Sequence, residues 1–216
     1  MRFNNRIVGM AKRLGLLAAI GLVAACAGGP GIDAGSGYYT LVRPQPQEVA
    51  RDSMVVTPTI AWNRARRTTY DISREENWTL NGPLLDSLTF IGGLEPGKTV
   101  VRQRRREERQ VPLYRADMSP PEIASVIESF YRIRAGSVRF EMTGLRPRTF
   151  LGHPGFQLDF DHLDSSEIER RGRVVGAIVG DRLYLVLLEG TRMHYFGAAL
   201  PEFERIVESA TLNASS

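Results

Sequence analysis

The chain has 216 residues, with 28 Lys or Arg, 24 Asp or Glu and a formal net charge of +4. Four of the 28 basic residues lie within residues 1–25, and the 24 that remain equal the 24 acidic residues in number. The rest of the chain is therefore formally neutral, which argues against nucleic acid or an anionic membrane as an electrostatic partner. A single cysteine excludes an internal disulfide.

The first 25 residues have the composition of a secretory signal. Residues 1–13 carry four basic residues and no acidic residue, and residues 14–25 are apolar apart from glycine. A basic segment followed by a short apolar run and small residues is typical of a cleaved signal. The run is shorter than the roughly 20 residues that a transmembrane helix needs. We therefore predict a signal peptide over residues 1–25.

The apolar run ends at the single cysteine of the chain. Val23-Ala24-Ala25-Cys26 resembles the lipobox of bacterial lipoproteins, in which a small residue precedes the lipid-bearing cysteine. The resemblance implies cleavage before Cys26, a diacylglyceryl group on its thiol, and in many bacteria acylation of the new amino group. Two or more acyl chains anchor a protein stably, at ~0.8 kcal/mol per buried CH₂. The alternative is an ordinary cleaved signal with an incidental cysteine.

Two features after Cys26 bear on location and organisation. In enteric lipoproteins an aspartate after the cysteine retains the protein at the inner membrane; Ala27 therefore implies the outer membrane, with the protein facing the periplasm. Residues 27–37 are rich in Gly and Ala without apolar periodicity, which predicts a flexible tether. Residues 26–37 are therefore expected to be the tether and the cysteine that the lipobox resemblance implies is lipidated. Residues 38–216 remain, a length typical of one domain with its own core.

Two helices are predicted in this domain. Ser119 is followed by two prolines and by Glu122, the spacing of a capping box, and apolar residues then recur at helical spacing. The first helix is therefore expected over residues 119–135, and a second apolar stripe predicts a C-terminal helix over residues 201–210. The aromatic residues expected to face the sheet from these helices are Phe130 and Phe203.

Apolar and β-branched runs predict the strands. They lie at residues 78–80, 84–91, 98–101, 137–145, 155–163 and 172–190. Residues 38–42 and 53–62 are β-rich but interrupted by prolines, which predicts edge strands or irregular entries. Residues 146–154 are expected to connect two of the strands, and the last run is expected to turn at Gly180 and Asp181 as a hairpin. The order of elements indicates a single α+β domain, an antiparallel β-sheet with packed helices.

The end of the chain resembles the PsbP-like fold. The matching residues are Trp62, Phe196 and the run Ala199-Leu200-Pro201-Glu202-Phe203-Glu204-Arg205-Ile206-Val207-Glu208-Ser209. The resemblance implies a sheet sandwiched by helices. Members of that fold class mostly act as binding or assembly accessories, so it also implies a non-catalytic role.

Arginine clusters are the candidate contact site. Five arginines lie close together in the sequence: Arg102, Arg104, Arg105, Arg106 and Arg109. A second run, Arg64-Ala65-Arg66-Arg67, has the same character. If both clusters meet on one face, their guanidinium groups suit phosphate or carboxylate groups of lipopolysaccharide or of a protein partner. The alternative is a solvated charged loop with local ion pairs.

Strand alternation over residues 155–163 places His162 on an apolar face and Asp159 and Asp161 on the opposite face. We interpret His162 as a structural histidine and the two aspartates as solvated side chains, with a metal ligand and a cation site as the alternatives. No spacing matches a zinc or EF-hand site. No Walker loop or G-x-G-x-x-G precedes a helix. We therefore expect no metal and no cofactor.

The motifs G-x-S-x-G, S-x-x-K and H-E-x-x-H are absent from the sequence. The sequence therefore favours a binding role over an enzyme. We expect a lipid-anchored cell-envelope protein that meets the membrane through Cys26, binds an envelope protein and does not bind nucleic acid. The alternatives are a small-molecule or glycan-binding lipoprotein, an envelope hydrolase with dispersed catalytic residues, and a passive structural component.

Overall fold

The computed structural model describes residues 37–68, 71–102 and 111–214, and residues 37–216 form one compact unit. Cys26 and the predicted signal and tether lie outside the described residues, as do four arginines of the predicted cluster: Arg104, Arg105, Arg106 and Arg109. Among the described residues, no helix is long and apolar enough to cross a membrane.

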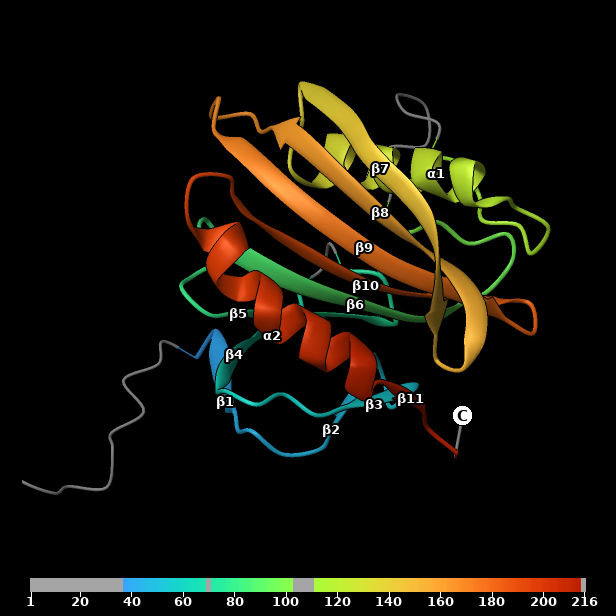
Figure 1. Cartoon of the computed structure of the whole chain (residues 1–216), viewed down its shortest axis with the longest axis horizontal. Helices are drawn as coiled ribbons and strands as arrows, with labels where there is room; N and C mark the ends of the chain where they lie inside the picture. The colour runs from blue at the N-terminus through green and yellow to red at the C-terminus, as the bar shows by residue number, and fades with distance from the viewer. Residues whose placement is uncertain (1–36, 69–70, 103–110, 215–216) are drawn as a thin grey trace, which may run out of the picture. The chain divides into compact units, whose positions relative to one another are not determined.

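An eight-stranded antiparallel sheet forms the centre of this unit, in the order β1-β4-β5-β6-β10-β9-β8-β7 (Figure 1). Its strands are β1 (Tyr39–Val42), β4 (Trp62–Ala65), β5 (Glu75–Thr79), β6 (Asp86–Leu94), β7 (Arg139–Phe150), β8 (His153–Leu163), β9 (Glu169–Val179) and β10 (Arg182–Thr191). A three-stranded sheet in the order β11-β3-β2 lies beside it. Its strands are β2 (Gln47–Val49), β3 (Met54–Val56) and β11 (Thr211–Leu212).

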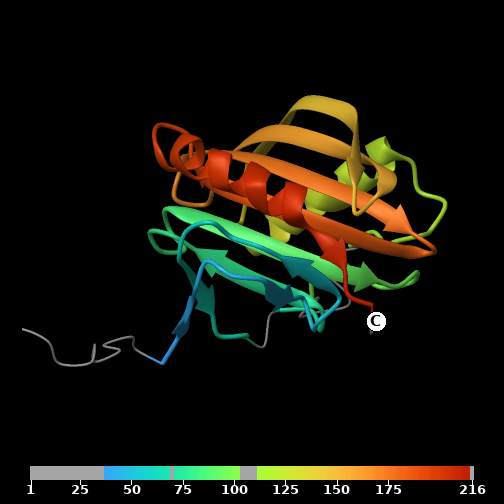
Figure 2. The same cartoon turned by 60° about the horizontal axis from the view of Figure 1, so that its bottom comes forward.

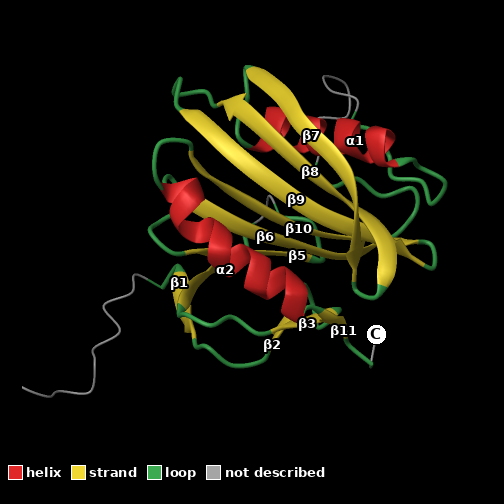
Figure 3. Cartoon of the chain, in the orientation of Figure 1, coloured by secondary structure: helices red, strands yellow, loops and turns green. Residues whose placement is uncertain are grey.

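Two helices cover opposite faces of the large sheet, as Figures 1 and 3 show. Helix α1 (Pro120–Arg134) packs against β7 and β8, and α2 (Tyr195–Ser209) contacts β10, β9, β6 and the small-sheet strand β3 (Figure 2). Phe130 on α1 and Phe203 on α2 are buried on their helices' apolar stripes, which confirms the expected packing. The α+β prediction is confirmed.

The capping box at the start of α1 is also confirmed. The Glu122 carboxylate accepts hydrogen bonds from both the backbone N–H and the hydroxyl of Ser119, each 2.7 Å long. These bonds hold the pKa of Glu122 below its usual value, mainly through the backbone N–H. A charged glutamate in the first turn also suits the positive end of the helix dipole.

The predicted start of the C-terminal helix at residue 201 is wrong, because α2 begins at Tyr195. Pro201 lies inside the helix rather than at its first position. The bond lost at Pro201 would have reached the carbonyl of Gly197. Both residues are exposed, so water can hydrate that carbonyl.

The β-rich residues 53–62 do not form one strand, because β3 ends at Val56 in the small sheet and β4 begins at Trp62 in the large sheet. Two further strand predictions are wrong. Residues 146–154 are not a separate connection: β7 and β8 extend through them and meet at a turn of Leu151 and Gly152, whose φ angles are 52° and 76°. Pro147 is tolerated because β7 is an edge strand, and Pro154 lies next to the first residue of β8. Residues 98–101 form no strand, although Val100 and Val101 are buried in the α1-side core. The apolar run there reflects burial rather than strand pairing.

Candidate functional site

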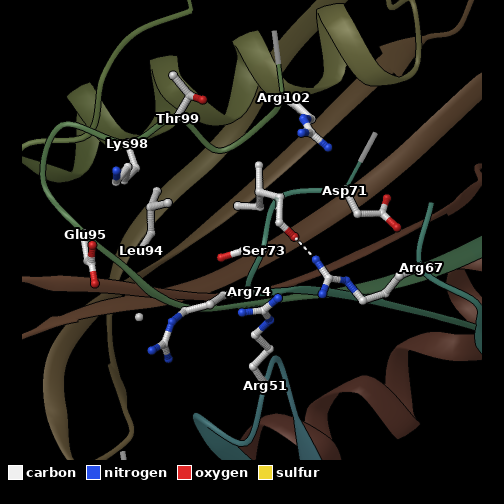
Figure 4. Close-up of a pocket in the computed structure, with 12 residues that line it drawn as sticks. Arg51, Arg67, Asp71, Ser73, Arg74, Leu94, Glu95, Lys98, Thr99 and Arg102 are labelled. Atoms are coloured by element: carbon white, nitrogen blue, oxygen red, sulfur yellow. Dashed lines mark hydrogen bonds between the residues drawn. The ribbon is translucent and has the colours of Figure 1, made fainter. Parts of the chain in front are cut away.

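A pocket of about 530 Å³ lies beside the end of β6 and the segment that leads into β5 (Figure 4). Five basic side chains line it, and we call it the cationic pocket: Arg51, Arg67, Arg74, Lys98 and Arg102. They come from the turn between β2 and β3, the approach to β5 and the loop after β6. Segments far apart in the sequence thus contribute cations to one opening.

The two acidic residues of the lining are neutralised by arginines outside it. Asp71 is buried, pairs with Arg134 of α1 at 2.8 Å and accepts a backbone N–H from Thr68. Glu95 lies 3.5 Å from Arg182 of β10. Neither Arg134 nor Arg182 lines the pocket. The acidic groups therefore do little to offset the basic side chains.

Four basic groups of the pocket make no ion pair within the described part of the chain. Arg51, Arg74 and Lys98 have no side-chain hydrogen bond or ion pair among the described residues, and Arg67 donates only to the backbone oxygen of Ile72, at 2.9 Å (Figure 4). Cations without a carboxylate partner keep their charge available for an anion. The pocket is therefore suited to bind negative charge.

Arg51 is presented by a left-handed backbone turn. Ala50, Arg51 and Asp52 have φ angles of 52°, 56° and 59°, and the turn closes through a 3.2 Å bond from the Ser53 N–H to the Val49 oxygen. Left-handed backbone costs an L-residue roughly 1–2 kcal/mol, and the cost is lowest for glycine. Three consecutive non-glycine residues thus hold an unfavourable conformation at the wall of the pocket.

The surrounding structure holds this turn in place. The carboxylate of Glu76 accepts the Ala50 N–H at 3.1 Å and the Trp78 indole N–H at 2.7 Å. On the sheet side, Gly92 allows close approach: a Cβ there would lie 1.7 Å from the Ser53 hydroxyl oxygen. The turn is therefore held by the hydrogen bond to the Glu76 carboxylate and by the close approach that Gly92 allows.

Lys98 is fixed from the other side by the segment that leads into α1. The Tyr114 N–H donates to the Lys98 oxygen and the Gly97 N–H to the Tyr114 oxygen, each at 2.8 Å. The buried Tyr114 ring anchors this pairing, and its hydroxyl donates to the Asp181 oxygen at 3.0 Å. Burial raises the pKa of Tyr114 to about 12, so the phenol remains a donor.

One residue from each of the two predicted arginine clusters lines the cationic pocket, Arg102 from the first and Arg67 from the second. Arg64 lies elsewhere, paired with Glu76 at 2.8 Å over the Trp78 ring. Three further lining residues were missed because each stands alone in the sequence: Arg51, Arg74 and Lys98. No local motif could have identified them, since only the fold brings them together.

The other candidate residues have structural surroundings. His162 is 1 % exposed and its Nε2 lies 3.5 Å from Glu189, but neither ring nitrogen has a hydrogen-bond partner among the described residues, so it is more buried and less satisfied than a structural histidine was expected to be. Asp159 and Asp161 are not simply solvated: Asp159 accepts from Arg146 at 3.1 Å and Asp161 from Arg171 at 2.7 Å. Across the described residues, no three His, Cys, Asp or Glu side chains converge as a metal site would require.

Neither the family models nor the curated proteins compared with the sequence give a match. Among solved structures, the chain is similar to cyanobacterial PsbP (CyanoP) from Synechocystis sp. PCC 6803. The identity is 12% and the TM-score 0.51, over 86% of this chain and 98% of that chain.

A second solved structure is LpqN, involved in cell envelope biogenesis of Mycobacterium tuberculosis. It has 10% identity and a TM-score of 0.34, with 83% of this chain and 87% of that chain covered. The similarity to CyanoP concerns the fold, and this chain has a PsbP-like α+β fold.

Proposed function

We propose that this protein is a lipid-anchored, non-catalytic binding protein of the bacterial cell envelope. Its cationic pocket receives a phosphate or carboxylate group of a ligand or of an envelope protein partner. The anchor is the lipid on Cys26, and Ala27 favours the outer membrane with the domain facing the periplasm. Residues 1–25 are removed, residues 26–37 are the tether, and residues 38–216 are the binding domain.

One observation carries the proposal: Arg51, Arg67, Arg74 and Lys98 surround one pocket and none has a carboxylate partner among the described residues. Hydrogen bonds to a charged partner contribute about 1.5–3 kcal/mol each. Arginine adds a planar fork that matches phosphate or carboxylate geometry. The strained turn under Arg51 supports the same conclusion, because backbone strain is concentrated at functional sites.

Binding is tested with the full-length protein in detergent, titrated with inorganic phosphate and followed by NMR. The triple variant Arg51→Gln, Arg74→Gln, Lys98→Gln is expected to bind phosphate at least tenfold more weakly, with an affinity that falls steeply with salt in the unsubstituted protein. A matched triple variant removes the same charge elsewhere: Arg43→Gln, Arg132→Gln, Arg192→Gln. Equal losses in both triples, or no phosphate binding at all, would refute the pocket as the site.

The anchor is tested by Cys26→Ser. This variant is expected to incorporate no labelled palmitate, and to stay as uncleaved precursor or appear as a soluble periplasmic protein. The reason is that serine lacks the thiol that accepts the diacylglyceryl group. Mature-sized protein that stays in the membrane fraction without lipid label and resists a carbonate wash would contradict the anchor.

A partner is sought by crosslinking the lipidated protein in its native membrane. If the pocket binds the partner, the triple variant of the pocket loses the crosslinked species and the matched triple keeps it. Retention of the same species by both proteins would place the partner contact outside the pocket.

A further inference from the structure

A second pocket, of about 680 Å³, lies between strands β5 and β6 and the C-terminal part of α1; we call it the α1 cleft. Asn77, Ser87 and Thr89 line it from the two strands and Tyr131 from the helix. Tyr38 and Tyr39, at the start of the described chain, are 70% and 36% exposed and also line it.

The charged groups of the α1 cleft neutralise one another. Arg134 pairs with Asp71 at 2.8 Å, and Arg170 pairs with Asp164 at 2.8 Å and with Glu189 at 2.9 Å. All five side chains line the cleft, as does Arg66, which has no ion pair among the described residues; three cations thus face three carboxylates. The α1 cleft is therefore close to neutral, in contrast to the cationic pocket, and suits an uncharged part of a ligand.

Hydroxyl groups with unused bonding capacity line this neutral cleft. Within the described residues, the side-chain hydroxyls of Ser87, Ser165 and Ser166 and the phenol of Tyr131 have no hydrogen-bond partner. Burial, with Glu189 nearby, raises the pKa of Tyr131 well above its usual value, so this phenol keeps its proton and can donate. Hydroxyls both donate and accept, which matches a polyhydroxylated ligand.

The α1 cleft and the cationic pocket share a wall. Asp71 lines both of them. Arg67 lines the cationic pocket, while its chain neighbours Arg66 and Thr68 line the cleft. The two openings therefore adjoin at Asp71 and at the segment that carries Arg66, Arg67 and Thr68, which a ligand with a charged end and a neutral end would have to span to occupy both.

We infer that the α1 cleft binds a neutral sugar ring of the same ligand whose anionic group occupies the cationic pocket, so that the ligand is an anionic saccharide. A pyranose ring carries hydroxyls around its edge, which match the serine hydroxyls and the Tyr131 phenol. Its C–H faces stack on aromatic rings such as those of Tyr38 and Tyr39. The inference rests on the proposed anion-binding function and names the ligand class for it.

Three probes separate the two subsites: maltose 1-phosphate, maltose and inorganic phosphate. They are titrated into the full-length protein in detergent and followed by NMR. Maltose 1-phosphate is expected to bind at least tenfold more tightly than inorganic phosphate, because only it fills both subsites. The double variant Tyr39→Ala, Ser87→Val should lose this advantage and keep its affinity for inorganic phosphate. Met142→Ala, on the opposite edge strand β7, is the control and should change neither.

The outcomes distinguish the inference from the proposed function. If the double variant binds maltose 1-phosphate as tightly as the unsubstituted protein, while phosphate still binds, the α1 cleft is not the sugar site and the proposed function stands. If inorganic phosphate does not bind, or binds independently of Arg51, Arg74 and Lys98, the proposed function fails. The inference that one ligand occupies both pockets then fails as well, even if maltose alone binds.

Discussion

Two arginine-rich regions of this molecule differ in how their charge is balanced. On the β8–β9 face, Asp161 accepts two hydrogen bonds from Arg171, and Arg173 bonds to both Asp159 and Glu204. In the cationic pocket, Arg51, Arg74 and Lys98 have no such partner among the described residues. The same residue type thus stabilises the fold in one region and leaves charge available for a ligand in the other.

This difference shows why a count of arginines along the chain says little about binding. Paired arginines in a surface network contribute modestly to stability and present little net charge. Unpaired cations around one opening contribute nothing to folding through pairing, and they repel one another slightly. The variants below test whether pairing is what separates the two regions.

The largest effect is expected where pairing is most buried. Arg170 is 5 % exposed and bonds to both Asp164 and Glu189. Arg170→Ala leaves two buried carboxylates without their partner and is expected to lower the free energy of unfolding by about 3–5 kcal/mol. Urea unfolding of the full-length protein measures it. Arg192→Ala, an exposed ion-pair residue, is the control, and a loss below about 1 kcal/mol for Arg170→Ala would show that this pair is unimportant.

In the cationic pocket, replacement of one arginine by glycine is expected to stabilise the protein. Arg51→Gly relieves a left-handed residue and should raise the free energy of unfolding by about 1 kcal/mol. Arg51→Ala removes the same charge without relieving the backbone. Both variants should weaken phosphate binding equally. Equal stability of the two variants in urea would show that the turn carries no strain.

The contribution of the ion pairs on the β8–β9 face to stability should depend on pH, whereas that of the unpaired arginines in the cationic pocket should not. The hydrogen bond from Arg171 holds the pKa of Asp161 below its ordinary value of 3.8. A carboxyl group with a lowered pKa stabilises the fold above its unfolded pKa, and this contribution is lost as pH falls through the folded value. Arg171→Gln should therefore lower the free energy of unfolding at pH 7 by less than about 1 kcal/mol, which is measured as a lower Tm. The difference in Tm from the unsubstituted protein should shrink below pH ~4.

Arg74→Gln is the matched control for this pH series, because Arg74 has no ion pair among the described residues. The difference in Tm between this variant and the unsubstituted protein should be the same at pH 7 and pH ~3, because Arg74 has no carboxylate partner that would be protonated. Parallel pH profiles for the two variants would contradict the distinction between the two regions.

The smallest effect is expected for an exposed pair on one helix. Arg132 of α1 bonds to Glu128 four residues earlier, at 2.7 Å. Pairs at this spacing contribute about 0.2–0.5 kcal/mol. Arg132→Gln should therefore lower the free energy of unfolding by no more than about 0.5 kcal/mol in urea. A loss above about 1 kcal/mol would mean that exposed arginine pairs in this protein are stronger than surface pairs usually are.

Local patterns predicted the elements whose signals lie within a few residues. Three such features were predicted correctly, because each depends on residues close together in sequence: the capping box at Ser119, the apolar stripe that carries Phe130 and the hairpin turn at Gly180. The start of α2 was misplaced because the apolar stripe was followed only from residue 201. The helix continues back to Tyr195, and Pro201 is tolerated inside it because that turn is exposed.

The sequence by itself predicted the α+β class, and it determined the abundance of arginine and the resemblance to a lipobox at Cys26. Only the tertiary structure decided which arginines are paired. Arg51, Arg74 and Lys98 are isolated in the chain, and they meet because β2, β5 and β6 bring their ends together. Ion pairing depends on distances of a few ångströms between segments remote in sequence, and the folded backbone sets those distances.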